Sequence, residues 1–167
     1  QEAQEVAALI GARIQPGESV VVLGQGAAGL LHTRLAKLSG AGPVVAVSRS
    51  AWKLELARRM KADRVVDAAR QDVLAEVSDA TGGRGADVVI DAAGHPALIP
   101  QAIEMAAPGG RLLMYGISHE PVPGFSTFPF YFKELTLYGS RALTPDDFEP
   151  AIGLVASGAI DVAEFVT

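Results

Sequence analysis

The stretch VVVLGQGAAGLLHTRLAKL, residues 20–38, decides the fold of this chain. It opens on an apolar run rich in Val and without polar alternation, which predicts a short strand over residues 19–23, buried on both faces. The turn Gly24-Gln25-Gly26-Ala27-Ala28-Gly29 follows directly, and a helix is predicted over residues 28–38. A G-x-G-x-x-G turn is a weak signal by itself, but a buried strand before it and a helix after it make it informative. This order predicts a turn that binds the phosphates of a nucleotide.

Each glycine of this turn has a distinct expected task. Gly24 would allow the tight turn, the bare Cα of Gly26 would let a pyrophosphate approach the backbone, and Gly29 would let the helix pack close to the strand. The free N–H groups of Ala27 and Ala28 would point at the phosphates, whose charge the helix dipole favours. The alternative is a glycine turn that merely connects a strand to a helix.

The end of the second predicted strand, residues 44–47, helps to select the ligand. A nicotinamide dinucleotide without a 2′-phosphate usually meets an Asp or Glu there, whereas this chain has Ser48 followed by Arg49. Ser48 can donate to a phosphate oxygen, and Arg49 can pair with one through its planar guanidinium. The missing carboxylate also removes a repulsion against a 2′-phosphate. The pattern favours NADP over NAD and weakens the case for S-adenosylmethionine. A flavin can use a similar turn, and Arg49 as a solvated residue beside a Ser48 helix cap is the alternative without function.

The rest of the chain alternates strands with helices. A leading helix is predicted over residues 2–13, and the elements after the second strand have these expected bounds: helices 52–60, 72–81 and 99–106, and strands 64–66, 87–91, 111–115 and 134–139, the last after a Pro-rich loop. Such alternation implies right-handed crossovers and a parallel sheet covered on both faces. We therefore predict an α/β, doubly wound parallel six-stranded sheet of order 3-2-1-4-5-6, the Rossmann fold, with its crevice at the carboxyl ends of the strands.

Composition excludes several classes of protein. The 167 residues carry a net charge of −5 with no basic run, which argues against nucleic acid or an anionic membrane as the main partner. The chain has no cysteine, and its three histidines show no His-x-x-x-His spacing, so we expect no disulfide and no metal site. No apolar run reaches about 18 residues, and the first residues show no signal-peptide pattern. A cytoplasmic protein is expected.

Six segments along the chain, taken in sequence order, resemble a known family and together cover nearly the whole chain. They are PGESVVVLGQGAAG, KLELARRMKADRVVD, TGGRGADVVIDAAG, APGGRLLMYGIS, FKELTLYGS and FEPAIGLVASGAIDV. In combination they resemble the cofactor domain of the medium-chain, alcohol-dehydrogenase-like dehydrogenases/reductases, and most closely the zinc-dependent alcohol, polyol and threonine dehydrogenase branch. The chain departs from that pattern at Ser48, where NAD-preferring members have an acid, and at Lys61, where a glycine is usual.

The resemblance implies roles for two groups of residues. The first group would hold the pyrophosphate and the adenosine half of the cofactor: Gly24, Gly26, Gly29, Ser48, Arg49, Lys53, Ala92 and Ala93. In it, Ser48 and Arg49 occupy the ribose selector and Lys53 matches a lysine that reaches that ribose. The second group would lie at the nicotinamide and its carboxamide: Ala28, Gly116, Ile117 and Ser140.

The resemblance also implies a second, GroES-like domain that supplies a catalytic zinc, its ligands and the proton relay. We expect that domain to be absent from this chain, with residues 1–145 forming the cofactor domain and 146–167 beginning the segment that returns to the missing domain. No catalytic residue can then be named here. The expected activity is hydride transfer between NAD(P) and an alcohol, polyol or carbonyl substrate, with the chain by itself inactive. The alternatives are a zinc-free quinone or enoyl reductase of the same superfamily and a stand-alone nucleotide-sensing module.

An aromatic cluster precedes the last predicted strand. It holds five of the ten aromatic residues: Phe125, Phe128, Phe130, Tyr131 and Phe132. They could cap the core beneath the sheet. They could also cover an outermost strand, residues 134–139, because an uncovered apolar edge associates unless it is paired. Family dimers join the edge regions of two cofactor domains, so we predict a homodimer through residues 121–139, alone or within a homotetramer.

Overall fold

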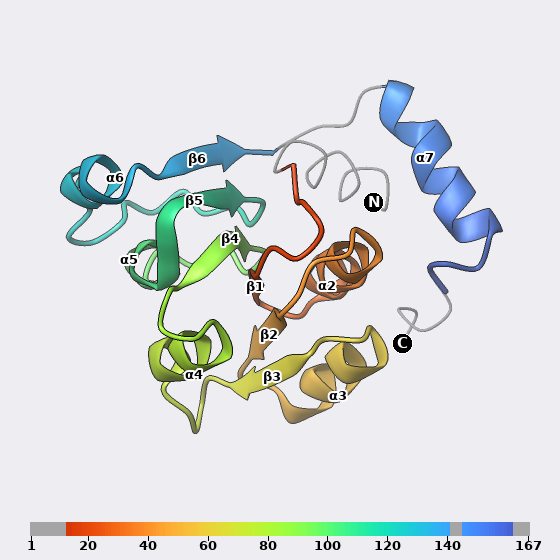
Figure 1. The fold of residues 1–167 in the computed structure, drawn as a ribbon, viewed down its shortest axis with the longest axis horizontal. Helices are drawn as coiled ribbons and strands as arrows, with labels where there is room; N and C mark the ends of the chain where they lie inside the picture. The colour runs from red at the N-terminus through yellow and green to blue at the C-terminus, as the bar shows by residue number, and fades with distance from the viewer. Residues whose placement is uncertain (1–12, 141–144, 162–167) are drawn as a thin grey trace.

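The computed structural model describes residues 13–140 and 145–161. Its centre is a parallel six-stranded sheet of order β3-β2-β1-β4-β5-β6 (Figure 1). The strands are β1 (Val20–Leu23), β2 (Val44–Ser48), β3 (Arg64–Asp67), β4 (Ala86–Asp91), β5 (Ala106–Met114) and β6 (Thr136–Gly139). The predicted fold class and strand order are confirmed. The helix predicted over residues 2–13 lies outside the described residues, apart from Arg13.

Helices cover both faces of the sheet. Helices α2 (Ala27–Leu38) and α3 (Ala51–Arg59) lie on one face, and α4 (Val73–Ala80) and α5 (Leu98–Met105) lie on the other (Figure 1). Alternate residues of β1 serve the two layers, since Val20 and Val22 pack with α2 while Val21 and Leu23 pack with α4 and α5. All four β1 residues are at most 1% exposed, which explains why their sequence shows no polar alternation.

Strand β5 begins earlier than the sequence suggested. The sequence predicts the fifth strand over residues 111–115, after a helix that ends at residue 106, yet Ala106 already pairs with Ala86 of β4. The next pair joins Val88 to Arg111, so the intervening residues of β5 form a bulge against β4. The bulge includes Gly109, whose φ of +73° favours glycine. The strand is therefore longer than the predicted one and contains a bulge near its start.

A short helix, α6 (Phe128–Lys133), replaces the last part of the expected Pro-rich loop. The Nζ atom of Lys133 donates to the backbone oxygens of Ile103, Glu104 and Ala106, at 3.1, 2.8 and 2.9 Å. These oxygens lie at the carboxyl end of α5, which leaves its last carbonyls without helical partners. Glu134 then ends α6 in the left-handed conformation (φ 54°), and β6 follows at the edge of the sheet.

The last described element, α7 (Pro145–Ala156), lies on the α2 side of the molecule (Figure 1). Ala151 and Ile160 are buried in the core that α2 shares with β1. Arg34 of α2 donates from Nε to the Ala159 oxygen at 3.0 Å. Among the helices described, none is long and apolar enough to cross a membrane.

Candidate functional site

A cavity of about 860 Å³ opens at the carboxyl ends of β1, β2 and β4. Its volume is typical of small-molecule and cofactor sites. In doubly wound sheets, ligands bind where the strand order reverses, and here that point lies between β1 and β4. The walls are formed by the glycine turn, by residues at the ends of β2, β3 and β4, and by the starts of α3, α4 and α5. The lining residues are Leu23–Gly26, Val47–Ser50, Lys53, Ala68, Gln71–Leu74, Ala92, Ala93, His95, Ala97, Leu98 and Gln101.

The glycine turn has the backbone that a phosphate site needs. Gly24 has a φ of +90°, and a Cβ added at Gly29 would lie 1.9 Å from the Gly24 oxygen. Both positions therefore require glycine. A Cβ added at Gly26 would meet no atom within 4 Å, so the space in front of this residue is open toward the cavity. A bulky group such as a pyrophosphate can approach the backbone there.

The start of α2 faces this open space with uncapped N–H groups. Gly26 is the N-cap, so no side chain caps the helix, and the first turn holds no acidic residue. The first helical hydrogen bond runs from the Leu30 N–H to the Gly26 oxygen, at 2.9 Å. The N–H groups of Ala27 and Ala28, before Leu30, remain available to an anion at the positive end of the helix dipole.

A buried amide holds the glycine turn in place. Gln25 is 1% exposed. Its Nε2 donates to the Val22 oxygen at 3.2 Å, and its Oε1 accepts from the Thr33 hydroxyl at 3.1 Å. The turn is thereby tied to β1 on one side and to α2 on the other.

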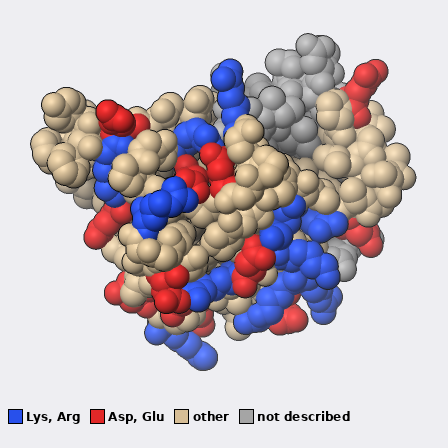
Figure 2. Space-filling model, in the orientation of Figure 1, with Lys and Arg blue, Asp and Glu red and all other residues tan. Residues whose placement is uncertain are grey.

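The end of β2 and the start of α3 bring two cations, Arg49 and Lys53, to the cavity. The Ser48 hydroxyl accepts from the Ser50 N–H at 3.2 Å and keeps its own hydrogen for donation. Arg49 is exposed, and the Lys53 ammonium lies 5.5 Å from the centre of the Trp52 ring. Figure 2 shows basic side chains gathered over the part of the surface that carries α3. Ser50 takes the N-cap position of α3, and its side chain makes no capping hydrogen bond.

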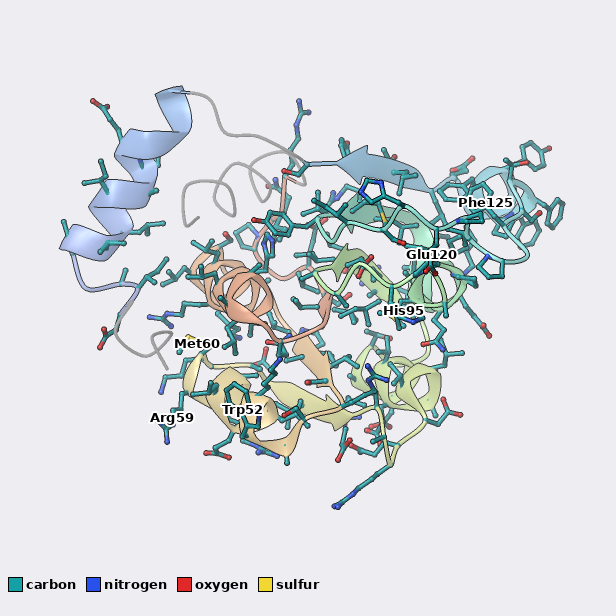
Figure 3. The ribbon with its side chains drawn as sticks, turned by 180° about the vertical axis from the view of Figure 1, so that it is seen from behind. Trp52, Arg59, Met60, His95, Glu120 and Phe125 are labelled. Atoms are coloured by element: carbon teal, nitrogen blue, oxygen red, sulfur yellow. The ribbon has the colours of Figure 1, made fainter. Side chains whose placement is uncertain are left out.

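The opposite wall is formed by the starts of α4 and α5. Asp72 caps α4 by accepting from the N–H groups of Leu74 and Ala75, at 3.0 and 3.2 Å. His95 belongs to the loop between β4 and α5, whereas Trp52 lies on α3 (Figure 3). The His95 Nδ1 accepts from the Ala97 N–H at 3.2 Å, so its Nε2 carries the hydrogen in the neutral ring.

The segments after β5 and β6 lie beyond the cavity walls. Gly116 is half-buried, whereas Ile117 is 79% exposed, although it is a large apolar residue. The Ser140 N–H donates to the Met114 oxygen at 3.1 Å, which extends the pairing of β6 with β5 to this residue.

A family model described as "Zinc-binding dehydrogenase" matches residues 27–157. This chain belongs to the zinc-binding dehydrogenase family. Among curated relatives, this zinc-binding dehydrogenase domain is 36% identical over 152 residues to the L-threonine 3-dehydrogenase of Bacillus licheniformis, covering 90% of the chain and 44% of that protein. The chain spans about half the length of the curated relatives it matches.

Solved structures agree with this assignment. The 2R,3R-butanediol dehydrogenase from Bacillus subtilis superposes with a TM-score of 0.90 at 27% identity, covering 99% of this chain and 47% of that one. A Sinorhizobium meliloti 1021 protein, described as a zinc-binding dehydrogenase bound to NADP, has a TM-score of 0.86 at 32% identity, covering 97% and 48%. The family resemblance drawn from the sequence is confirmed.

The cavity gathers part of the residue set predicted for this zinc-binding dehydrogenase domain. Gly24, Gly26, Ser48, Arg49, Lys53, Ala92 and Ala93 line it together. Ala27, Ala28, Gly29, Gly116, Ile117 and Ser140 do not line it. Sequence reasoning missed the starts of α4 and α5, residues 71–74 and 95–101. The topological rule could have found them, because carboxyl ends of neighbouring parallel strands border one crevice.

The described part of the zinc-binding dehydrogenase chain offers no ligand set for zinc. Within residues 13–140 and 145–161, no three His, Asp or Glu side chains come close enough to hold a metal ion. The sequence contributes no cysteine either.

Proposed function

We propose that this chain is the nicotinamide-binding domain of an oxidoreductase that transfers hydride between NAD(P) and an alcohol or polyol, or the corresponding carbonyl compound. The observation that carries the proposal is the open space before Gly26, beside the uncapped start of α2. This is the place where a dinucleotide pyrophosphate would bind. Calorimetric titration of the chain with NADP and NAD tests it, and an absence of binding at millimolar cofactor would contradict it.

The bound cofactor would supply the hydride chemistry, and the chain would bind and orient it. The N–H groups of Ala27 and Ala28 would hold the pyrophosphate. The adenosine half would lie in the cavity, against Ala92 and Ala93. The side chain of Ala28, with Gly29 packing its helix onto the turn, would back the nicotinamide ring.

We place the carboxamide of the nicotinamide at the ends of the last two strands. Gly116, Ile117 and Ser140 would hold it with backbone groups. The high exposure of Ile117 supports this placement, because a bound ring would cover an apolar side chain that otherwise faces solvent.

NADP is the cofactor we propose, in preference to NAD. Arg49 and Lys53 line the cavity beside the Ser48 hydroxyl, and no carboxylate occupies the Ser48 position to repel a 2′-phosphate. The NADP bound to the Sinorhizobium meliloti relative gives independent support.

The substrate we propose is a secondary alcohol next to a carbon that carries oxygen or nitrogen. Threonine and 2,3-butanediol, in the names of two relatives, both have this arrangement. The zinc ligands that the family name implies are expected outside the described residues. Residues 1–145 would then form the cofactor domain and 146–167 would begin a segment that serves a second domain. A cytoplasmic location stays a prediction. A zinc-free reductase or a nucleotide sensor would show no alcohol oxidation in the whole protein.

A second copy of this chain is the partner we propose for the edge of the sheet. Four of the five clustered aromatics are exposed, by 49 to 82%: Phe125, Phe128, Tyr131 and Phe132. Phe130 packs against the core, so the core-capping alternative describes only this residue. The region of α6 is mostly uncharged in Figure 2, and Phe125 lies at the same end of the molecule in Figure 3. Pairing β6 with its copy would cover the edge strand and these rings.

A further inference from the structure

Asp91, the last residue of β4, is a buried carboxylate with no task in cofactor binding so far. It is 2% exposed. Burial raises the pKa of this carboxyl group, and hydrogen bonds from the N–H groups of Gly94 and Ala93 oppose that change. Aspartate is almost never fully buried unless it is paired, so this placement calls for a physical reason.

Asp91 accepts hydrogen bonds from four backbone N–H groups. Its Oδ1 atom accepts from Ala93 and Gly94, both at 3.0 Å. Its backbone oxygen accepts from Tyr115 at 3.0 Å and from Gly116 at 2.7 Å. The carboxylate of Asp91 therefore holds the turn after β4, and its backbone oxygen holds the beginning of the segment after β5.

The two segments held by Asp91 touch each other through their backbones. A Cβ added at Gly116 would lie 2.1 Å from the Gly94 nitrogen. A Cβ added at Gly94, whose φ is +68°, would lie 2.6 Å from the Ile117 nitrogen. Because no side chain separates the segments, a shift of the turn at residues 92–94 is transmitted directly to Gly116 and Ile117.

The phosphate turn depends less on Asp91. Ala93 also contacts this turn, since a Cβ at Gly24 would lie 2.8 Å from the Ala93 Cβ. However, the Gly24 N–H donates to the Val47 oxygen at 3.0 Å, and Gln25 ties the turn to both its flanking elements. The Ala92 N–H also donates to the Leu23 oxygen of β1, at 2.9 Å, so the part of the turn that would meet the adenosine half has a second anchor. Gly94, which touches Gly116 and Ile117, is instead held by the Asp91 carboxylate.

We propose that Asp91 is a positioning residue for the nicotinamide half of the cofactor. Its carboxylate holds the turn at residues 92–94 in one shape, and that turn supports the Gly116-Ile117 backbone where the nicotinamide would bind. Asp91 would touch no cofactor atom, because its carboxylate would act on the Gly116-Ile117 backbone through Gly94. The inference rests on the proposed function, which places the nicotinamide at Gly116 and Ile117.

The test compares a whole cofactor with its adenosine half. NADPH and adenosine 2′,5′-bisphosphate are titrated by calorimetry into the chain and into its Asp91→Ala and Asp91→Asn variants. Removing charge-assisted hydrogen bonds should weaken NADPH binding about tenfold or more in Asp91→Ala, while the bisphosphate changes less than about threefold. The NADPH affinity of Asp91→Asn should lie between those of the wild type and Asp91→Ala, because the amide oxygen can still accept from both N–H groups but carries no charge.

Asp87 provides the matched control on the same strand. Its carboxylate pairs with Arg84 and with Ser19, at the end of β4 away from the cavity. Asp87→Asn should lower stability in urea and leave the ratio of the two affinities unchanged. If Asp91→Ala does not fold, the losses of affinity for the two ligands are compared in Asp91→Asn.

Three outcomes in the variants overturn the proposal. The first is an equal loss of affinity for both ligands in the Asp91 variants, and the second is a larger loss of affinity for the bisphosphate than for NADPH. The third is a loss in Asp87→Asn that is larger for NADPH than for the bisphosphate. A wild-type chain that binds NADPH no more tightly than the bisphosphate would also overturn it. A wild-type chain that binds neither ligand would instead refute the proposed function and this inference together.

Discussion

His32 makes the stability of this chain depend on pH in a window that can be predicted. The ring is fully buried in α2, and neither ring nitrogen has a hydrogen-bond partner. It meets Tyr115 edge-on, with ring centres 4.8 Å apart and planes at 78°. Burial lowers the pKa of His32 from 6.5 to about 4, because the charged ring would lose its hydration there.

The sign of the effect follows from the protons bound in each state. Below pH 6.5 the unfolded chain protonates His32, whereas the folded chain keeps the ring neutral until about pH 4. Stability is therefore complete above pH 6.5 and is lost as the pH falls through this interval. The difference between the two pKa values corresponds to about 3 kcal/mol in total, of which about 2 kcal/mol is lost by pH 5.

Urea denaturation at pH 7.5 and pH 5 measures this loss. The free energy of unfolding should fall by about 2 kcal/mol more in the wild-type chain than in His32→Leu, which cannot take up the proton. Asp87, whose pKa its Arg84 partner lowers to about 2, loses its contribution only below pH 3.8 and so stays outside the range. His119→Gln, at an exposed position, should behave like the wild type. Equal pH dependence in the wild type and His32→Leu would refute the reasoning.

Three further predictions concern the cofactor and the edge of the sheet. Arg49→Ala should weaken NADP binding about tenfold or more and NAD binding much less, whereas Arg59→Ala, also exposed but outside the cavity, should change neither in calorimetry. An equal loss for both cofactors would show that Arg49 does not read the 2′-phosphate. Gly26→Val should abolish cofactor binding by occupying the pyrophosphate space. The melting temperature should stay nearly unchanged, because the backbone of Gly26 (φ −75°) suits any residue and a Cβ added there meets no atom within 4 Å. Retained cofactor affinity would contradict the proposed place of the pyrophosphate. Phe128→Glu with Phe132→Glu, which charges two stacked exposed rings, should turn a dimer into a monomer in sedimentation velocity, and a wild-type monomer at high concentration would contradict the interface.

The sheet and the glycine turn could be predicted because their signals are local. The Val-rich strand at residues 20–23 is apolar on both faces, and glycine at positions 24 and 29 is required by the backbone there. Both facts act through neighbours in the sequence, so the pattern of residue types reflects them directly. The strand order then follows from the alternation of elements.

The missed features depend on contacts between distant segments. Helix α6 is too short to form by propensity, and it is fixed by Lys133 binding to α5, about 30 residues earlier in sequence. The early start of β5 depends on the pairing of Ala106 with Ala86 across a bulge. The cavity walls at the starts of α4 and α5 come into place only when β3 and β4 join the sheet. Local patterns of residues do not predict such contacts.

Lys133 gives the chain a built-in chemical reporter for its outer edge. All three donors of an ammonium group are matched by the three backbone oxygens at the end of α5. An acylating reagent needs the free amine, so it can react only after the side chain leaves these oxygens. The rate of Lys133 acylation, followed by mass spectrometry, would therefore report how often the Lys133 side chain leaves the end of α5. Assembly at β6 that holds α6 in place would slow that reaction without any change in the reagent.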